Sequence, residues 1–223
     1  VEKKAKMFGY KHEVVWDLMI VSVVGGVLGA RAYHVVSEWD FYSQHPERIL
    51  QIWNGGLALF GALVGGFVSM NLYAKQKSIK LLPYIDLVAV ALPLAQAIGR
   101  FGNFFNQELY GLPTNLPWKL YINPENRLRG YESIEFFHPL FAYEIILNLI
   151  LFSILNRKLA VKQKLVGTGY FIWFYLAGYM TIRFLLEFLR LESWNINGIN
   201  VAQVIAVSVI LLAVNRLRKL RVK

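Results

Sequence analysis

Four polar residues at short spacing follow an apolar segment near the middle of the chain. Arg100, Asn103 and Asn106 are three residues apart, and Glu108 follows them within residues 99–111. If the helix continues through this stretch, the first three side chains share one face. A guanidinium group suits a phosphate, and asparagine amides add neutral donors and acceptors. The pattern indicates a phosphate-binding site, and the alternative is a structural hydrogen-bond network closed by Glu108.

A second polar group lies in a later apolar segment. Arg183, Glu187 and Arg190 stand at i, i+4 and i+7, so one helical face carries two guanidinium groups and one carboxylate. Arg183 and Glu187 could neutralise each other as a structural pair, which is common for opposite charges within a membrane. Because one carboxylate cannot neutralise both arginines, the surplus positive charge also favours an anionic ligand.

Other polar residues lie near the same ends of apolar segments, and each is a weak signal alone. Arg31 either contributes to a site or extends to lipid headgroups. Glu144 is placed deeper and is expected to pair with an arginine. The set comprises Arg31, His34, His138, Tyr143 and Glu144.

The elements that must position these groups are long apolar segments. Hydrophobic residues make up 56% of the 223 residues, and charged residues only 17%. A helix needs about 20 apolar residues to cross a bilayer, and most of the segments approach that length. We therefore predict an all-α polytopic membrane protein with six transmembrane helices, forming one integral membrane domain over residues 1–223. The segments lie at 14–36, 57–74, 84–98, 140–155, 168–189 and 199–214.

The net charge of +10 arises from basic residues that cluster at alternate ends of these segments. Cytoplasmic loops of membrane proteins carry an excess of Lys and Arg, so we predict that both termini are cytoplasmic and that both polar groups face outward. A nucleic-acid partner is not expected, because no basic stripe carries interleaved stacking aromatics. The basic clusters lie at 3–11, 75–80, 157–164 and 216–223.

Residues 106–137 form the longest stretch outside the predicted spans. Pro113, Pro117 and Pro124 interrupt it, so we predict a compact, irregular extracytoplasmic cap, with short strands possible. The cap is either a solvated head or a lid over a site.

Glycines mark a close helix contact. Gly61, Gly65 and Gly66 lie in the second predicted span, where small residues let helix backbones approach. Gly55 and Gly56 precede that span and predict a tight turn.

The chain contains no cysteine. It can therefore form no disulfide and offers no cysteine nucleophile, and any thiol in its chemistry must come from a partner.

The stretch 99–111 resembles the signature of the bacterial phosphatidylglycerol–prolipoprotein diacylglyceryl transferases, G-R-x-G-N-F-x-N-x-E-x-x-G. Every fixed position of that signature is filled. Similar family features appear as a GAR turn at 29–31, the Gly55–Gly56 pair, HP…YE at 138–144, RFxxEFxR at 183–190 and NGxNxAQ at 197–203. The signature residues are Gly99, Arg100, Gly102, Asn103, Phe104, Asn106, Glu108 and Gly111.

The resemblance implies transfer of a diacylglyceryl group from phosphatidylglycerol to the lipobox cysteine thiol of a prolipoprotein, with release of glycerol phosphate. It implies a multi-pass protein of the bacterial inner membrane with an outward-facing site, and no metal or cofactor. The expected catalytic residues are Arg100, Glu108, Arg183 and Arg190. The expected substrate-binding residues are Asn103, Asn106, Gly111, Arg31, His138, Tyr143, Glu144 and Glu187.

The chain departs from the family pattern at two places. The family pattern G-G-x-x-x-H-G has a histidine that has been viewed as the base, and here that position is Phe60. Glu108, His34 or His138 could replace it, or the cationic site could lower the thiol pKa unaided. The resemblance also implies one more span before the first one seen here.

Two alternatives to an active transferase remain. One is a catalytically weakened family member that binds lipid or lipoprotein. The other is an unrelated six-span transporter, for which paired discontinuous helices in two halves would be expected.

Overall fold

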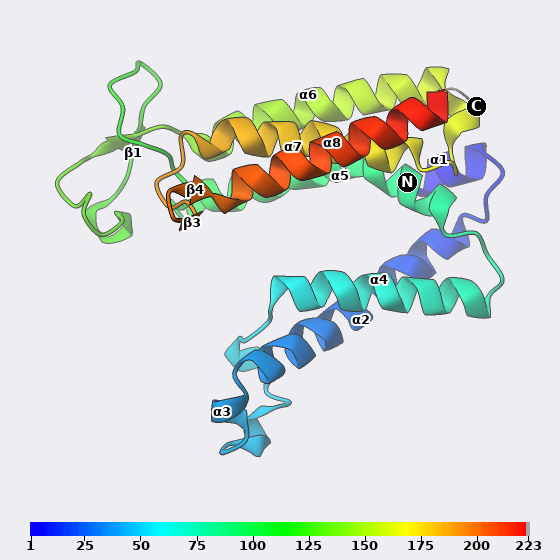
Figure 1. The fold of residues 1–223 in the computed structure, drawn as a ribbon, viewed down its shortest axis with the longest axis horizontal. Helices are drawn as coiled ribbons and strands as arrows, with labels where there is room; N and C mark the ends of the chain where they lie inside the picture. Colours follow the sequence, from blue (N-terminus) through cyan, green and yellow to red (C-terminus); the bar gives the residue numbers. More distant parts are fainter. Residues whose placement is uncertain (222–223) are drawn as a thin grey trace. The chain divides into compact units, whose positions relative to one another are not determined.

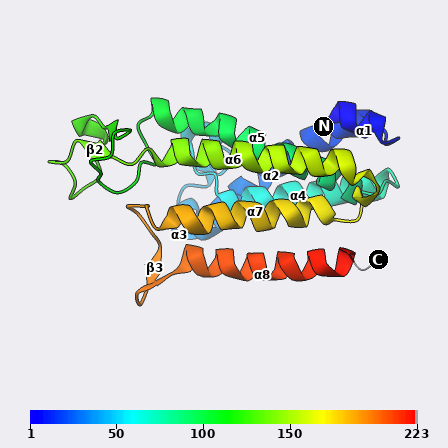
Figure 2. The same ribbon diagram turned by 90° about the horizontal axis from the view of Figure 1, so that it is seen from above.

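Helices dominate residues 1–221, which the computed structural model describes (Figures 1 and 2). The chain divides into two compact units, Val1–Tyr84 and Ile85–Lys223, which are described separately. All six predicted spans form helices. Four helices of the described part are long and apolar enough to cross a membrane: α2 (Glu13–Ser37), α5 (Leu82–Phe105), α6 (Leu140–Val161) and α8 (Val201–Arg221).

The other two predicted spans form shorter helices. These are α4 (Leu59–Gln76) and α7 (Tyr170–Glu187), each 18 residues long. Their mean hydropathy is too low for a candidate membrane span. Helix α4 ends in polar residues that include Lys75, and α7 carries Arg183 and Glu187 within its last turns.

The N-terminal unit is built on α2 and α4, which lie side by side in both views of the ribbon (Figures 1 and 2). A Cβ atom at Gly65 would lie 2.8 Å from the Cα atom of Gly29, so only glycine permits this approach. Gly61 similarly meets the carbonyl oxygen of Gly29. Ser69 Oγ on α4 adds a hydrogen bond of 3.0 Å to the carbonyl of Val21. The predicted role of the α4 glycines in helix packing is confirmed.

Short elements complete this unit. Helix α1 (Glu2–Met7) precedes α2, and α3 (Trp39–Tyr42) with two 3-10 turns, Pro46–Arg48 and Ile52–Asn54, connects α2 to α4. Gly55 and Gly56 have φ values of +84° and +72°, so the predicted tight turn is present.

The C-terminal unit is a bundle of α5, α6, α7 and α8, which run alongside one another in both views (Figures 1 and 2). A buried carboxylate fixes two of these helices. Asp86 near the start of α5 accepts backbone N–H bonds of 2.9 to 3.1 Å from Gly167, Gly169, Phe171 and Ile172 at the start of α7. The carboxylate thus caps the N-terminus of α7, where unpaired N–H groups and the helix dipole favour negative charge.

The contact of Asp86 with the N-terminus of α7 determines how far along the bundle the later polar residues of α5 and α7 lie. Arg100 lies 14 residues after Asp86, and Arg183 lies 13 residues after Tyr170, the first residue of α7. At 1.5 Å rise per residue, both arginines are carried about 20 Å from the shared end. They therefore reach the same level of the bundle.

Residues 106–139 link α5 to α6 and fold on a small core. Strands β1 (Leu120–Tyr121) and β2 (Phe136–Phe137) pair antiparallel around the buried side chains of Tyr110, Ile122 and Phe137. Burial raises the pKa of Tyr110, so its hydroxyl stays neutral; it donates to the Asn126 carbonyl (2.9 Å) and accepts from Leu128 N–H (2.7 Å). The predicted short strands are present.

A second hairpin leads from α7 to α8. Its strands are β3 (Asn195–Ile196) and β4 (Ile199–Asn200), with the left-handed residues Asn197 and Gly198 at its tip. Asn200, the last residue of the hairpin, directly precedes α8, which begins at Val201.

Candidate functional site

An ion pair between α5 and α6 forms the centre of the site. Arg100 Nη2 lies 2.7 Å from Glu144 Oε1, and Arg100 Nη1 donates to Asn103 Oδ1 at 3.1 Å. The Glu144 side chain is 9% exposed and that of Arg100 is 26% exposed, so the arginine side chain remains partly accessible. The prediction that Glu144 pairs with an arginine is confirmed.

The signature stretch folds back onto this pair. Helix α5 ends at Phe105, and the chain turns through Gln107 and Leu109, which both have positive φ. Gln107 supports the turn because its Oε1 accepts the Asn123 N–H at 2.8 Å. The turn returns Glu108 to the helix end.

Glu108 closes a network with the two asparagines. Its Oε1 accepts from Asn103 Nδ2 at 2.8 Å and from Asn106 Nδ2 at 3.2 Å. Within residues 1–221 its Oε2 accepts no hydrogen bond, so one carboxylate oxygen is free. The three-residue spacing thus brings together the residues that the sequence pointed to, although Asn106 lies just beyond the helix.

The second polar group lies at the end of α7. Glu187 Oε2 lies 2.9 Å from Arg183 Nη2 and 3.8 Å from Arg190 Nη1, and the Glu187 side chain is 1% exposed. Asn200 Nδ2 donates to Glu187 Oε1 at 3.3 Å. The carboxylate is therefore held by both predicted arginines and by Asn200, which was not among the predicted site residues.

Tyr179 of α7 joins the two groups. It interacts electrostatically with Glu144, Arg100 and Arg183. One turn earlier on α7, Tyr175 contacts Gln96, which lies one turn before Arg100 on α5. A tyrosine within an apolar run carries no periodic signal, so sequence reasoning missed both residues.

A third hydrogen-bonded chain lies at the start of α6. Trp118 Nε1 donates to the Tyr143 hydroxyl at 2.7 Å, and that oxygen lies 3.0 Å from His138 Nδ1. Because an indole N–H can only donate, the Tyr143 proton remains available for His138 Nδ1. In a neutral imidazole ring this arrangement places the His138 proton on Nε2. Trp118 was not among the predicted residues.

Gly111 connects the cap to the end of α7. Its N–H donates to the His138 carbonyl at 2.8 Å, and it forms a bridge to Arg190. A Cβ atom at Gly111 would lie 2.7 Å from the Leu189 carbonyl oxygen. The structure therefore requires glycine at this position for space.

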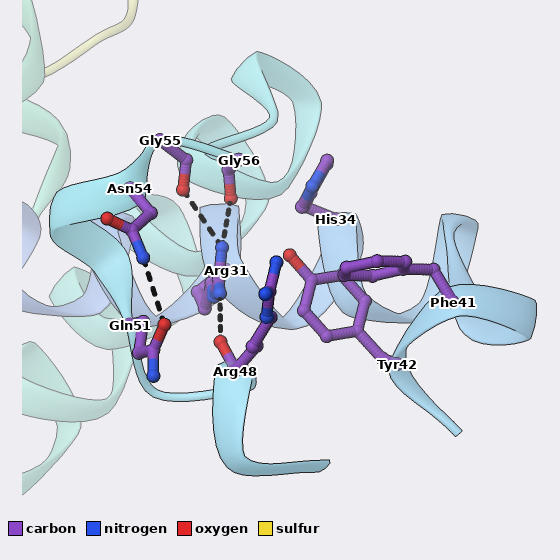
Figure 3. Close-up of a pocket in the computed structure, with 9 residues that line it drawn as sticks. All are labelled: Arg31, His34, Phe41, Tyr42, Arg48, Gln51, Asn54, Gly55 and Gly56. Atoms are coloured by element: carbon purple, nitrogen blue, oxygen red, sulfur yellow. Dashed lines mark hydrogen bonds between the residues drawn. The ribbon is translucent and has the colours of Figure 1, made fainter. Parts of the chain in front are cut away.

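Arg31 lies in the N-terminal unit and is buried, with 7% exposure. Its guanidinium donates to the carbonyls of Ile49 (2.7 Å), Gly55 (2.9 Å), Gly56 (3.1 Å) and Arg48 (2.5 Å), as Figure 3 shows in part. Its carbon Cζ also lies 5.1 Å from the centre of the Tyr42 ring. The alternative that Arg31 extends to headgroups is wrong, because the side chain folds the connecting loop instead.

Phe60 lies in the first turn of α4 and is 66% exposed. Its ring offers no group that accepts or donates a proton. The position where the family resemblance led us to expect a histidine is thus apolar.

These helices and the ion-paired cluster at their ends define an all-helical, multi-pass membrane protein with a polar site in which the carboxylates of Glu144 and Glu187 are buried. The family model described as "LGT: Prolipoprotein diacylglyceryl transferase" matches residues 1–217. The chain belongs to the prolipoprotein diacylglyceryl transferase family.

Individual relatives agree. The chain is 44% identical over 224 residues to a phosphatidylglycerol–prolipoprotein diacylglyceryl transferase of Trichormus variabilis, covering 98% of this chain and 79% of the relative. A Fervidobacterium nodosum protein of the same name is 39% identical over 209 residues, covering 93% of this chain and 71% of the relative. This membership rules out the unrelated transporter.

Proposed function

We propose that this chain transfers a diacylglyceryl group from phosphatidylglycerol to the cysteine thiol of a prolipoprotein. The family match over nearly the whole chain carries this conclusion, since the relatives bear the name of that activity. The complete signature at residues 99–111 supports it, because each of its polar side chains lies in one connected network. The reaction forms a sulfur–carbon bond, breaks a carbon–oxygen bond and releases glycerol phosphate.

Arg100 holds the lipid phosphate in this proposal, with Asn103 beside it. Its Nη groups are oriented by Glu144 and Asn103, whereas its buried Nε has no hydrogen bond within residues 1–221. A guanidinium fixed in this way meets a phosphate without reorganising, which is the condition for electrostatic stabilisation of a transition state.

Arg183 and Arg190 stabilise the charge that develops on the leaving phosphate. Only one Nη atom of Arg183 contacts Glu187, and the Arg190 contact is longer at 3.8 Å. Both arginines therefore keep donors that can turn to an anion, and Glu187 fixes their position.

The thiol must lose its proton, because its reference pKa of about 8.5 leaves it mostly protonated at neutral pH. We assign this role to Glu108, whose Oε2 is free while Oε1 is held by two amides. His138 is less suited, since its Nδ1 is occupied by Tyr143 and its proton lies on Nε2. His138, Tyr143 and Asn106 then contribute to binding at the same end.

Space for a substrate exists on α5 next to Arg100. A Cβ atom at Gly99 or Gly102 would meet no described atom within 4 Å, in contrast to Gly111. Packing within the described residues does not require these two glycines, so we assign them to close approach by a bound lipid or peptide.

We further propose that all six long helices span the membrane as one domain. The alternation of basic clusters supports cytoplasmic termini and an outward site, with residues 106–137 as an extracytoplasmic cap. This orientation suits a secreted precursor that presents its cysteine outside the cytoplasm of a bacterium.

A catalytically weakened lipid-binding member is the second candidate, and Phe60 is the observation that favours it. Labelled phosphatidylglycerol and a lipobox peptide, incubated with the purified chain, separate the two. Lipidated peptide supports the transferase, whereas bound lipid without product supports the weakened member. In the second case, activity restored by Phe60→His would locate the defect.

A further inference from the structure

A cavity of about 200 Å³ lies in the N-terminal unit, and none of its lining residues is among those assigned above to phosphate binding. It opens between the last turn of α2, helix α3 and the loop that leads to α4 (Figure 3). All of its walls belong to residues 31–56, so it is complete within this unit.

Arg31 gives this cavity a positive wall. Its guanidinium is buried and binds four backbone carbonyls of the loop, so those oxygens are no longer available as acceptors. No carboxylate within residues 1–221 lines the cavity or neutralises Arg31. The positive charge of Arg31 therefore acts on any ligand in the cavity, and little solvent screens it because the guanidinium is buried.

The remaining polar wall carries donors that make no hydrogen bond within residues 1–221, although Arg48 also lies over the Phe41 ring, with its Cζ 5.6 Å from the ring centre. Arg48 lines the cavity, and neither of its Nη atoms makes a hydrogen bond within residues 1–221. The His34 ring lies against Gly56 and edge-on to Tyr42, at 5.8 Å between ring centres, and its nitrogens make no hydrogen bond within residues 1–221. Gln51 uses its Oε1 to accept from Asn54 at 2.9 Å, which leaves its amide N–H groups free. Figure 3 labels these groups among the nine residues that line the cavity.

The nearest carboxylate lies outside this wall. Glu47 Oε1 is 4.0 Å from Arg48 Nε and 3.5 Å from His45 Nδ1, and all three side chains are exposed. Exposed ion pairs of this kind are weak, so Glu47 does not hold Arg48 away from the cavity.

We propose that this cavity binds a phosphate-bearing anion, with Arg48 as its principal ligand and His34 and Gln51 as further donors. Two guanidinium groups that share a small space repel each other until an anion lies between them. The planar fork of Arg48 matches two phosphate oxygens. The space admits a phosphate with a short alcohol but not acyl chains as well, so the ligand is either a lipid headgroup or a free phosphate ester. The proposal does not depend on transferase activity.

The test uses the four histidines of the chain as local probes. The full chain, labelled with ¹⁵N-histidine and placed in phosphatidylcholine nanodiscs, is titrated with inorganic phosphate and with glycerol phosphate. A parallel sample is prepared in nanodiscs that contain phosphatidylglycerol. The His34 signal is identified through the His34→Gln variant. We expect a saturable shift of this signal, with soluble phosphates if the source is a free ester and with phosphatidylglycerol alone if the source is a headgroup.

Variants decide which residue binds. Arg48→Gln should weaken the affinity by about tenfold or more, as loss of charged hydrogen bonds predicts. Arg129→Gln removes the same charge from an exposed position of the C-terminal unit and should leave the affinity unchanged. Glu47→Gln should leave or strengthen it.

The proposal is wrong if neither the soluble phosphates nor phosphatidylglycerol shift the His34 signal, or if Arg48→Gln binds as tightly as the wild type. Failure here is distinct from failure of the proposed function, because the titration involves no turnover. A chain that lipidates a peptide but shows no His34 shift retains the function and loses only this site.

Discussion

Arg100 on α5 and Glu144 on α6 are joined at 2.7 Å, and this pair fixes the guanidinium at the end of the bundle. Arg100→Ala should reduce transfer by about a hundredfold or more, the range seen when one donor to a developing anion is removed. Arg100→Lys should also be impaired, because it keeps the charge but loses the fork. Transfer to a lipobox peptide at equal protein concentration measures both effects.

Loss of Arg100 also leaves Glu144 buried without its partner, which can destabilise the fold. The double variant Arg100→Ala/Glu144→Gln removes that charge and serves as the control. We expect it to be inserted in the membrane and inactive. Retained turnover in either Arg100→Ala background would defeat the assignment of phosphate binding.

Glu187 contacts Arg183 and Arg190, and we expect it to position these arginines rather than to react. For Glu187→Gln we expect a larger loss of folded yield than of turnover per folded molecule, since the buried carboxylate holds Arg183 at 2.9 Å. Loss of a buried ion-pair partner is worth about 3 to 5 kcal/mol. Size-exclusion profiles beside activity per folded molecule separate these effects. Wild-type yield with abolished turnover would contradict this account.

Trp118 is expected to set the tautomer of His138 through Tyr143. In the wild type, ¹⁵N spectra of neutral His138 should show the proton on Nε2. In Trp118→Phe the Tyr143 oxygen is free to accept, so a population with the proton on Nδ1 should appear. Tyr121→Phe, which alters an exposed aromatic residue of the same cap, should leave the spectrum unchanged. A wild-type proton on Nδ1 would refute the proposed hydrogen-bond order.

Asp86 is expected to determine stability far from the chemistry. Asp86→Ala leaves four backbone N–H groups at the start of α7 without their acceptor, so it should destabilise the bundle by about 3 kcal/mol or more. Thermal unfolding in detergent measures this, with Asp40→Asn in exposed α3 as the matched control. Equal melting temperatures of the two variants would show that the Asp86 carboxylate is not needed at the start of α7.

The sequence located the helices, but the apolar runs do not mark where the helices end. The third apolar run ends at residue 98, and the continuation of the helix through Arg100 was conditional; α5 does continue, to Phe105, and Arg100 pairs there with Glu144. The partner of Glu144 was expected to be an arginine, yet spacing alone could not say which one. Chain positions 44 residues apart meet only through tertiary packing.

Other contacts had no signal in one sequence. Asp86 looks like an isolated charge near a helix start, and its role appears only when the turn at Gly167 and Gly169 is placed against it. Trp118 and Tyr179 lie among many aromatic residues without a pattern. Asn200 was visible in a family-like motif, but its contact with Glu187 depends on the hairpin before α8.

The central claim is that this chain, with Phe60 in place, transfers a diacylglyceryl group to a thiol. The most direct measurement is mass spectrometry of a lipobox peptide incubated with the purified chain and phosphatidylglycerol, with glycerol phosphate quantified in the same sample. We expect a mass gain of one diacylglyceryl group on the cysteine, matched one to one by released glycerol phosphate. Unmodified peptide with no released glycerol phosphate, in a sample that is folded and binds the lipid, would contradict the claim.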